Sequence, residues 1–412
     1  MALIVAKFGG TSVADIPRIE KAAAKIVREV EAGHKVVVVV SAMSGVTNQL
    51  VQYCSDVSPM YDAREYDVVV SSGEQVTAGL MALSLQKKGI VARSWLGWQI
   101  PFRTNHTHGK ARIRDIDSDL ILERLDKGEV AVVPGFQGVS DQNRITTLGR
   151  GGSDTSAVAL AAALKADRCD IYTDVDGVYT TDPRIVPNAR KIKKIAYEEM
   201  LELASLGAKV LQTRSVEIAT KQHVNLQVLS SFEDHIGSDL PGTLVTKEED
   251  IVEQELVTGI AYTRDEAKIT ALKVPDIPGI AAKIFRPLAD ASINVDMIVQ
   301  NISSDGKTTD MTFTVPRVDL ERSLETLKKS EHFKDVNFVT AEKMSKISVV
   351  GIGMRSHAGV ANTMFETLAE KGINIQVIST SEIKISVLIS DDYTELAVRS
   401  LHAAYGLDVA KA

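Results

Sequence analysis

The sequence predicts an α/β protein in which a mainly parallel β-sheet, sandwiched by helices, is followed by a repeated βαββαβ unit. From Met1 to about Ser231, short β-branched runs alternate with longer helical patterns, which is typical of strand–helix units around a parallel sheet. The segment from Ser231 to about Glu255 is polar and acidic and marks a domain boundary. Beyond it, the sequence repeats itself with a period of about 80 residues.

The first strand–helix unit illustrates the pattern. Leu3–Ala6 is a predicted strand, Gly9–Ser12 a turn, and Val36–Val40 the returning strand. The helix between them is predicted to carry one apolar face, made of Ile16, Ile19, Ala23, Ile26, Val27 and Val30. Further strands of the same sheet are predicted at Val130–Val133, Asp170–Thr173 and Leu226–Leu229.

In the C-terminal repeat, a glycine precedes a predicted helix and an asparagine follows it. The recurring positions are Gly279, Ala281, Phe285, Leu288, Ala289, Ile293, Asn294 and Ile298, matched by Gly359, Ala361, Phe365, Leu368, Ala369, Ile373, Asn374 and Ile378. Strands flank each copy and a second helix follows, which predicts two helices on one face of a sheet. Duplication alone would enlarge the core, whereas the glycine turn and the asparagine favour a ligand at the helix N-terminus.

Composition excludes several classes of protein. Of the 412 residues, 44% are apolar and 25% charged, which argues against a disordered, collagen-like or membrane protein, and a net charge of −7 disfavours broad nucleic-acid binding. Cys54 and Cys169 lack metal-ligand spacing and are expected to be reduced thiols. Met1–Phe8 has no cleavage site and Val36–Val40 is too short to span a bilayer, so we expect a cytoplasmic protein.

The motif Lys-Phe-Gly-Gly-Thr-Ser, from Lys7 to Ser12, lies where a strand ends and a helix is about to begin. Two adjacent glycines let backbone N–H groups approach an anion, and Lys7 adds a positive charge that would neutralise a transferring phosphoryl group. A plain glycine turn with a surface lysine is the alternative. Neither a Walker A motif nor a dinucleotide fingerprint is present.

A second glycine-rich motif, from Thr147 to Asp154, leads into a predicted helix from Ala157 to Leu164. The N-terminal amides of that helix would form a second anion site. Asp154 is predicted to lie near the phosphate-facing lysines or a metal, and Arg150 to bind a substrate carboxylate through two hydrogen bonds. The alternative for Asp154 is a simple helix cap.

Four further segments are individually weak signals. Asp174–Arg184 follows a strand and would suit a nucleoside, although an ordinary turn explains it as well. Ser41–Thr47 supplies hydroxyls after the second strand. Ser71–Gln75 is expected just before a helix, where Glu74 either binds the α-ammonium of an amino acid or is a solvated residue at the helix start. Gly207–Lys209, expected at a helix start, adds a second lysine.

Taken in this order, ahead of a repeated unit, these motifs resemble the aspartate kinases of the amino-acid kinase family over nearly the whole chain. Lys-Phe-Gly-Gly-Thr-Ser is typical of aspartate kinases within that family, and the repeat resembles tandem ACT modules that bind feedback amino acids. The resemblance implies an amino-acid-kinase fold followed by two ferredoxin-like ACT modules. The kinase domain would comprise residues 1–245, the first module residues 263–342, and the second module residues 246–262 together with 343–412. It also implies transfer of the ATP γ-phosphate to the β-carboxylate of L-aspartate, giving 4-phospho-L-aspartate for lysine, threonine and methionine synthesis.

The resemblance assigns roles to individual residues. The catalytic residues would be Lys7, Asp154 and Lys209. ATP would be bound by Lys7, Phe8, Gly9, Gly10, Thr173, Asp174, Tyr179, Arg184, Lys209 and Val210. Aspartate would be bound by Ser41, Thr47, Glu74, Arg150, Gly151, Gly152 and Ser153. MgATP would be a co-substrate, with magnesium carried mainly by ATP, no tightly bound cofactor, and Asp154 acting as lysine organiser or as part of the magnesium shell.

A carboxylate acceptor is already anionic at neutral pH, so transfer requires positioning and charge neutralisation rather than a general base. This agrees with the histidine pattern, since His106 and His108 lie in a segment without metal-ligand spacing and are interpreted as loop residues.

The repeat is expected to bind lysine, threonine or both as feedback effectors. In the first copy the predicted effector site comprises Asp276, Gly279, Ile280, Ala281, Asn294, Val295, Ile298 and Gln300. In the second copy it comprises Gly359, Val360, Ala361, Asn374, Ile375, Ser381 and Glu382.

A homodimer or a dimer of dimers, paired through exposed edges of the sensor modules, is expected. A separate small sensor subunit is less expected, because no methionine lies between Met200 and Met297 to start it. The alternative functions are a related kinase acting on glutamate, N-acetylglutamate or UMP, and a non-catalytic amino-acid sensor.

Overall fold

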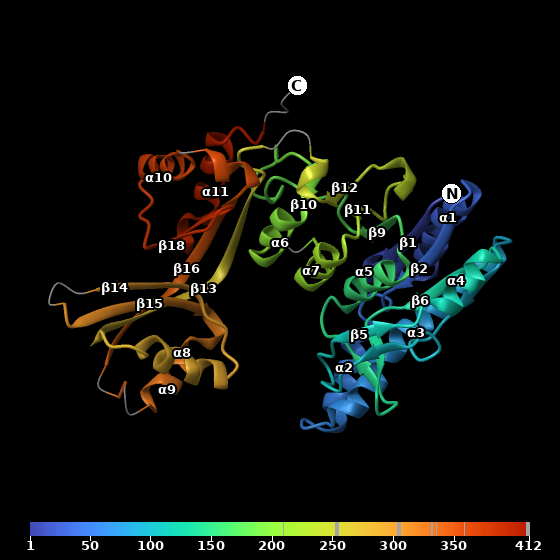
Figure 1. Cartoon of the computed structure of the whole chain (residues 1–412), viewed down its shortest axis with the longest axis horizontal. Helices are drawn as coiled ribbons and strands as arrows, with labels where there is room; N and C mark the ends of the chain where they lie inside the picture. The colour runs from blue at the N-terminus through green and yellow to red at the C-terminus, as the bar shows by residue number, and fades with distance from the viewer. Residues whose placement is uncertain are drawn as a thin grey trace. The chain divides into compact units, whose positions relative to one another are not determined.

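The computed structural model describes residues 1–208, 210–251, 255–302, 306–330, 333–334, 336–357 and 359–408. The chain divides into two units, and Figure 1 labels most of their helices and strands. The first unit comprises Met1–Val178, Lys191–Ala204 and Lys209–Val252. The second comprises Tyr179–Arg190, Ser205–Ala208 and Glu253–Ala412.

The first unit is built on a central sheet with the strand order β10-β12-β11-β9-β1-β2-β6-β3. Its neighbouring strands run parallel, apart from the antiparallel pair β11 and β12. The strand bounds are β1 Leu3–Phe8, β2 Lys35–Val40, β3 Ala92–Ser94, β6 Val130–Pro134, β9 Arg168–Thr173, β10 Lys194–Ala196, β11 Leu226–Ser230 and β12 Thr243–Thr246. The predicted mainly parallel sheet is therefore confirmed.

A smaller sheet and a set of helices complete this unit. The small sheet has the order β5-β4-β7-β8, with β4 Phe102–Thr104, β5 Ile113–Ile116, β7 Gln137–Ser140 and β8 Ile145–Thr147. The helices are α1 Ile16–Glu31, α2 Val46–Val57, α3 Ala63–Lys87, α4 Asp119–Asp126, α5 Gly152–Leu164, α6 Tyr197–Ser205 and α7 Thr213–Gln222. Single 3-10 turns lie at η1 Gly10–Val13, η2 Gly237–Asp239 and η3 Glu248–Asp250.

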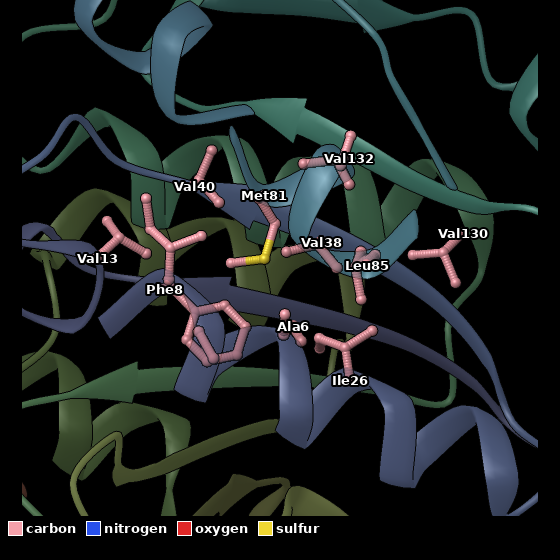
Figure 2. Close-up of a cluster of buried hydrophobic side chains, with 14 of the residues drawn as sticks. Ala6, Phe8, Val13, Ile26, Val38, Val40, Met81, Leu85, Val130 and Val132 are labelled. Carbon is pink, nitrogen blue, oxygen red and sulfur yellow. The ribbon is translucent and has the colours of Figure 1, made fainter. Parts of the chain in front are cut away.

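Two helices, α1 and α3, seal one face of the central sheet, as Figure 2 shows. Side chains that alternate along β1, β2 and β6 point toward these helices, because successive residues of a strand face opposite sides of a sheet. Met81 and Leu85 of α3 and Ile26 of α1 cover them. The predicted apolar face of α1 is confirmed for its central positions, but Ile16 is half exposed because it is the first residue of the helix, directly after the Asp15 cap.

Helix α3 is the described helix that is long and apolar enough to cross a membrane. However, 56% of its most apolar stretch is buried inside the protein, as in the core helix of a folded domain.

The second unit contains one antiparallel sheet with the order β14-β15-β13-β16-β18-β17. The strand bounds are β13 Gly259–Pro275, β14 Asp296–Ile302, β15 Thr308–Pro316, β16 Asn337–Val350, β17 Val377–Thr380 and β18 Lys384–Ser390. The helices are α8 Ile280–Asp290, α9 Leu320–Lys328, α10 Val360–Glu370 and α11 Thr394–Ala404, with turns at η4 Arg317–Asp319, η5 Ile352–Ser356 and η6 Asp391–Tyr393.

Each copy of the repeat has its own core. Helices α8 and α9 pack on strands β13 and β15, whereas α10 and α11 pack on β16, β18 and the start of β13 (Figure 1). This confirms the predicted pairs of helices on a sheet. Strand β13 serves both copies, since Ile260 packs in the core of the second copy and the residues from Ala267 onward pack in the core of the first. Its pairing with β16 shifts register between Thr263 and Lys268. Lys346 of β16 is buried and forms ion pairs with Asp296 of β14 and Glu266 of β13, which joins the two copies.

Candidate active site

The carboxyl ends of β1 and β2 meet the first turn of α5 at one edge of the central sheet. Gly9 follows β1 and donates its N–H to the Tyr172 carbonyl at 3.2 Å. Its backbone is extended, so glycine is not needed there for a left-handed conformation. A Cβ on Gly9 would make only an ordinary contact, 3.4 Å from Lys7 Nζ. Space is limited at Gly10, where a Cβ would lie 3.1 Å from the Ala42 carbonyl oxygen.

Lys7 and Asp154, predicted 147 residues apart to share one site, form an ion pair at 2.6 Å between Nζ and Oδ1. Their side chains are only 9% and 12% exposed, so the pair is largely shielded from water. Helix α5 begins five residues earlier than predicted, which puts Asp154 in its first turn. Gly151 is the N-cap, so the alternative of Asp154 as a simple cap is wrong.

The hydroxyl groups predicted to bind substrate also converge. Ser41, just after β2, donates a hydrogen bond to the Ser153 hydroxyl at 2.8 Å. Gly135, just after β6, permits this approach, because a Cβ there would lie 2.7 Å from the Ser153 Cβ. Thr47 lies in the first turn of α2 and is half-buried.

Glu74 lies in the middle of α3 and not at a helix start as predicted, so the interpretation as a solvated helix-start residue is wrong. The side chain is buried, and this burial raises its pKa to about 7, although the Ala42 N–H group partly counteracts the shift. Oε2 of Glu74 has no hydrogen-bond partner among the described residues. Gly73 brings the helix close to this segment, since a Cβ there would lie 2.9 Å from the Ala42 Cβ. A buried carboxylate with a free oxygen is suited to bind a cation.

Arg150 lies between two glycines with left-handed backbone, Gly149 (φ +83°) and Gly151 (φ +69°). Only glycine adopts this conformation without strain, so the loop turns sharply on both sides of the arginine. The Arg150 carbonyl accepts a hydrogen bond from Gln212 Nε2 at 3.2 Å. Its side chain is exposed, and within the described ranges the guanidinium forms no ion pair or hydrogen bond, so it is free to meet an anion.

A buried cluster that no sequence motif indicates lies next to this loop. Asp67 of α3 is fully buried and lies 2.6 Å from His108 Nδ1 and 2.5 Å from the Thr147 hydroxyl, measured to its carboxylate oxygens. His108 does lie in the connection between β4 and β5, as predicted, but its side chain is 9% exposed and tied to Asp67. No group of three or more metal-ligating side chains occurs in the part of the chain that the structure describes.

The predicted ATP-binding residues are brought together only in part. Phe8 stacks on Tyr172 with ring centroids 4.6 Å apart, so its side chain belongs to the core and only its backbone can face a nucleotide. Thr173 ends β9 and donates to the Asp174 carboxylate at 3.2 Å. Tyr179 and Arg184 belong to the second unit, so their approach to Thr173 stays a prediction.

Two further ATP contacts were predicted beyond α6. Lys209 lies outside the described residues, and Val210 is half-buried in a turn before α7. Arg184 is exposed and donates to Asp182 at 2.7 Å.

The two copies of the repeat place their glycine turns alike. Gly279 and Gly359 are the N-caps of α8 and α10, at φ +90° and +104°, with open space where a Cβ would be. Ile280 and Val360 point into the cores, so only their backbones can face an effector. Asn294 and Asn374 are both exposed. The remaining predicted positions that are exposed or half-buried are Asp276, Ala281, Val295, Ile298, Gln300, Ala361, Ile375, Ser381 and Glu382.

Comparison with known proteins gives one consistent result. Residues 2–230 match the amino acid kinase family, and residues 269–332 and 347–405 each match an ACT domain. Aspartate kinase from Pseudomonas putida is 55% identical over 410 residues, covering 99% of this chain and 98% of that protein. E. coli aspartokinase III in complex with aspartate and ADP (R-state) has a similar structure, with a TM-score of 0.81 at 26% identity, covering 98% of this chain and 99% of that chain. Its complex with lysine and aspartate (T-state) gives a TM-score of 0.77 at 27% identity over the same shares of the two chains.

Proposed function

Since the chain belongs to the aspartate kinases of the amino acid kinase family, which are phosphotransferases, we propose that it moves the γ-phosphate of ATP to the β-carboxylate of L-aspartate. The product is 4-phospho-L-aspartate, an activated intermediate for lysine, threonine and methionine synthesis. The protein works in the cytoplasm, where ATP and free amino acids are available.

The observation that carries this proposal is Glu74, a buried carboxylate with one unpaired oxygen. It binds the α-ammonium of aspartate, and Arg150 binds the α-carboxylate. Ser41, Thr47 and Ser153, with the backbone of Gly151 and Gly152, hold the rest of the amino acid. N-acetylglutamate and UMP have no ammonium group, so neither would satisfy the buried carboxylate.

Phosphoryl transfer depends on positioning and on neutralising charge, because the attacking β-carboxylate is already anionic. Lys7 neutralises charge on the transferring phosphoryl group, and Asp154 holds Lys7 in place, as their ion pair supports. Lys209 supplies a second cation. Gly9 and Gly10 bring backbone amides to the phosphates, and the Phe8 backbone, Thr173, Asp174 and Val210 line the rest of the nucleotide site. Tyr179 and Arg184 stay predicted contacts of the nucleotide.

Magnesium reaches the site with ATP and neutralises charge on the phosphate oxygens. Asp154 is the carboxylate of this site next to Lys7, and its Oδ1 makes no well-aligned hydrogen bond with the described residues beyond the ion pair. It thereby fits the role of lysine organiser and keeps the capacity to contact a bound metal ion.

A coupled assay that measures ADP release with aspartate, glutamate, N-acetylglutamate or UMP as acceptor tests the proposal. Aspartate should be the preferred acceptor by kcat/KM. Preference for another acceptor would replace the proposed substrate, and no turnover with any of them would favour a non-catalytic amino-acid sensor.

The proposed domains are a kinase domain of residues 1–245, a first ACT module of residues 263–342, and a second of residues 246–262 with 343–412. The pairing of Gly259–Thr263 with Lys346–Val350 supports giving the start of β13 to the second module. The two modules bind lysine, threonine or both and inhibit the kinase. Two chains, or two such pairs, assemble through the modules.

A further inference from the structure

Asp67 is a fully buried acidic residue of the first unit that phosphoryl transfer itself does not use. Its carboxylate is 0% exposed, and a buried carboxylate is tolerated only where hydrogen bonds replace water. Thr147 Oγ1 donates to it at 2.5 Å, His108 Nδ1 lies at 2.6 Å, and the Gly109 N–H donates to its two oxygens at 3.1 and 3.2 Å.

The residues that hydrogen-bond Asp67 lie next to the loop that carries Arg150. Thr147 is the last residue of β8, three residues before Arg150. Its carbonyl accepts a hydrogen bond from the Ala111 N–H at 2.9 Å, which fixes the connection between β4 and β5 against the same strand end. A Cβ on Gly149 would lie 3.2 Å from the Gly109 carbonyl oxygen, so this connection also packs directly on the Arg150 loop.

Helix α3 therefore contacts both ends of the proposed aspartate site. Asp67 and Glu74 are seven residues apart, which is two helical turns, so they lie on the same side of the helix. Glu74 faces the ammonium directly, whereas Asp67 holds Thr147 at the end of β8 and through it the loop that carries Arg150. A rigid helix of 25 residues keeps the two carboxylates at a fixed separation.

We propose that Asp67, with His108 and Thr147, is a positioning cluster that holds the Arg150 loop at the right distance from Glu74 for the α-carboxylate and α-ammonium of one amino acid. The proposal rests on the proposed roles of Arg150 and Glu74. A network that only stabilises the fold would change stability without a selective effect on the amino acid.

Thr147→Val tests this, because it removes the hydroxyl while keeping the shape of the side chain. We expect the KM for aspartate to rise about tenfold while the KM for ATP changes less than twofold, since only the amino-acid loop loses its anchor. Thr147→Ser, which keeps the hydroxyl, should restore the aspartate KM to within about twofold of wild type.

Thr146→Val is the matched control. Thr146 is the preceding residue of β8, is equally buried, and hydrogen-bonds Thr104 at 2.6 Å on the opposite face of the strand. It should leave the KM for aspartate within about twofold of wild type. An equal rise in both threonine-to-valine variants would overturn the proposal in favour of a general folding effect.

Combination with Arg150→Ala separates this inference from the proposed function. If Thr147 acts through Arg150, Thr147→Val should add less than about twofold to the aspartate KM of Arg150→Ala. A full additional rise, or a Thr147→Val enzyme with normal aspartate KM, would overturn the positioning role and leave the function intact. If Arg150→Ala itself kept a normal aspartate KM, the proposed role of Arg150, and with it this inference, would fall.

Discussion

If Glu74 binds the α-ammonium as proposed, its raised pKa should make aspartate binding depend on pH. Burial raises this pKa from its ordinary 4.5 to about 7, so the carboxylate is only partly ionised near neutral pH in the free protein. An ammonium bound to Glu74 favours the ionised form, which means that binding must expel the proton at lower pH. The KM for aspartate should therefore fall as the pH rises from 6 to 8.

The magnitude follows from the two pKa values. One pH unit below a pKa of about 7, about nine-tenths of Glu74 is protonated, so the aspartate KM should be about tenfold higher at pH 6 than at pH 8. A carboxyl with an ordinary pKa of 4.5 would give almost no change over this range. Initial rates at saturating ATP give the aspartate KM, and the ATP KM at saturating aspartate is the internal control.

The same burial predicts an opposite effect on stability. A carboxyl whose folded-state pKa is raised contributes its stability below its unfolded pKa and loses it as the pH rises through the folded one, here from about 4.5 to about 7. The difference of about 2.5 between the pKa values corresponds to about 3 kcal/mol of penalty at pH 8. Glu74→Gln cannot ionise, so without substrate it should be more stable than the wild type at pH 8 by about this amount.

Glu74→Gln therefore links the two measurements. It should raise the aspartate KM, abolish the pH dependence of that KM, and unfold at higher urea concentration than the wild type at pH 8 but not near pH 4.5. A wild-type aspartate KM that is the same at pH 6 and pH 8 would refute the role of Glu74. So would a pH dependence that survives in the glutamine variant.

The other predictions concern the phosphate site, the helix approach and the sensor. Lys7→Met and Asp154→Asn should each lower kcat about 10²-fold in the coupled assay. In urea unfolding, the double variant should lose less stability than the sum of the losses of the two single variants, because it leaves neither buried charge unpaired. Gly135→Ala should lower kcat/KM for aspartate at least tenfold while circular dichroism stays native, because its Cβ would displace the start of α5. Asn294→Ala and Asn374→Ala should raise the half-inhibitory concentration of lysine or threonine about tenfold, or ~1.4 kcal/mol, measured against each variant's own uninhibited rate; unchanged inhibition in both would exclude these positions from the effector sites.

The fold could be predicted from the sequence where the pattern is local or repeated. The valine run of β2 and its flanking helices predict a buried parallel strand, because such strands are apolar on both faces. The repeat was equally clear, and the burial pattern confirms it: residues 293–300 and 373–380 show the same order of buried, half-buried and exposed side chains.

The sequence was insufficient where a helix runs through polar residues or where partners are distant. Ser71 and Gly73 lie in the middle of α3, but the sequence predicts a helix start there. Serine and glycine are weak helix formers and are common at helix caps, which explains the wrong prediction. In the structure, the small side chain of Ser71 and the missing side chain of Gly73 allow the centre of the helix to pack tightly. Asp67 and His108 gave no signal, because their contact spans 41 residues and depends on how the β4–β5 connection folds back onto the helix.

In the free protein, the residues proposed to bind ATP and aspartate differ in how they are paired. Lys7 is already paired with Asp154, so in the proposed role the ATP phosphates would share it, and the lysine would be held where charge develops during transfer. One oxygen of Glu74 has no partner among the described residues, so the proposed ammonium would relieve the penalty of burying this carboxylate. Under the proposed roles, recognition of the amino acid would lower the stability of the free protein, whereas the phosphoryl group would meet a preformed ion pair. Glycines let the elements around both sites approach closely.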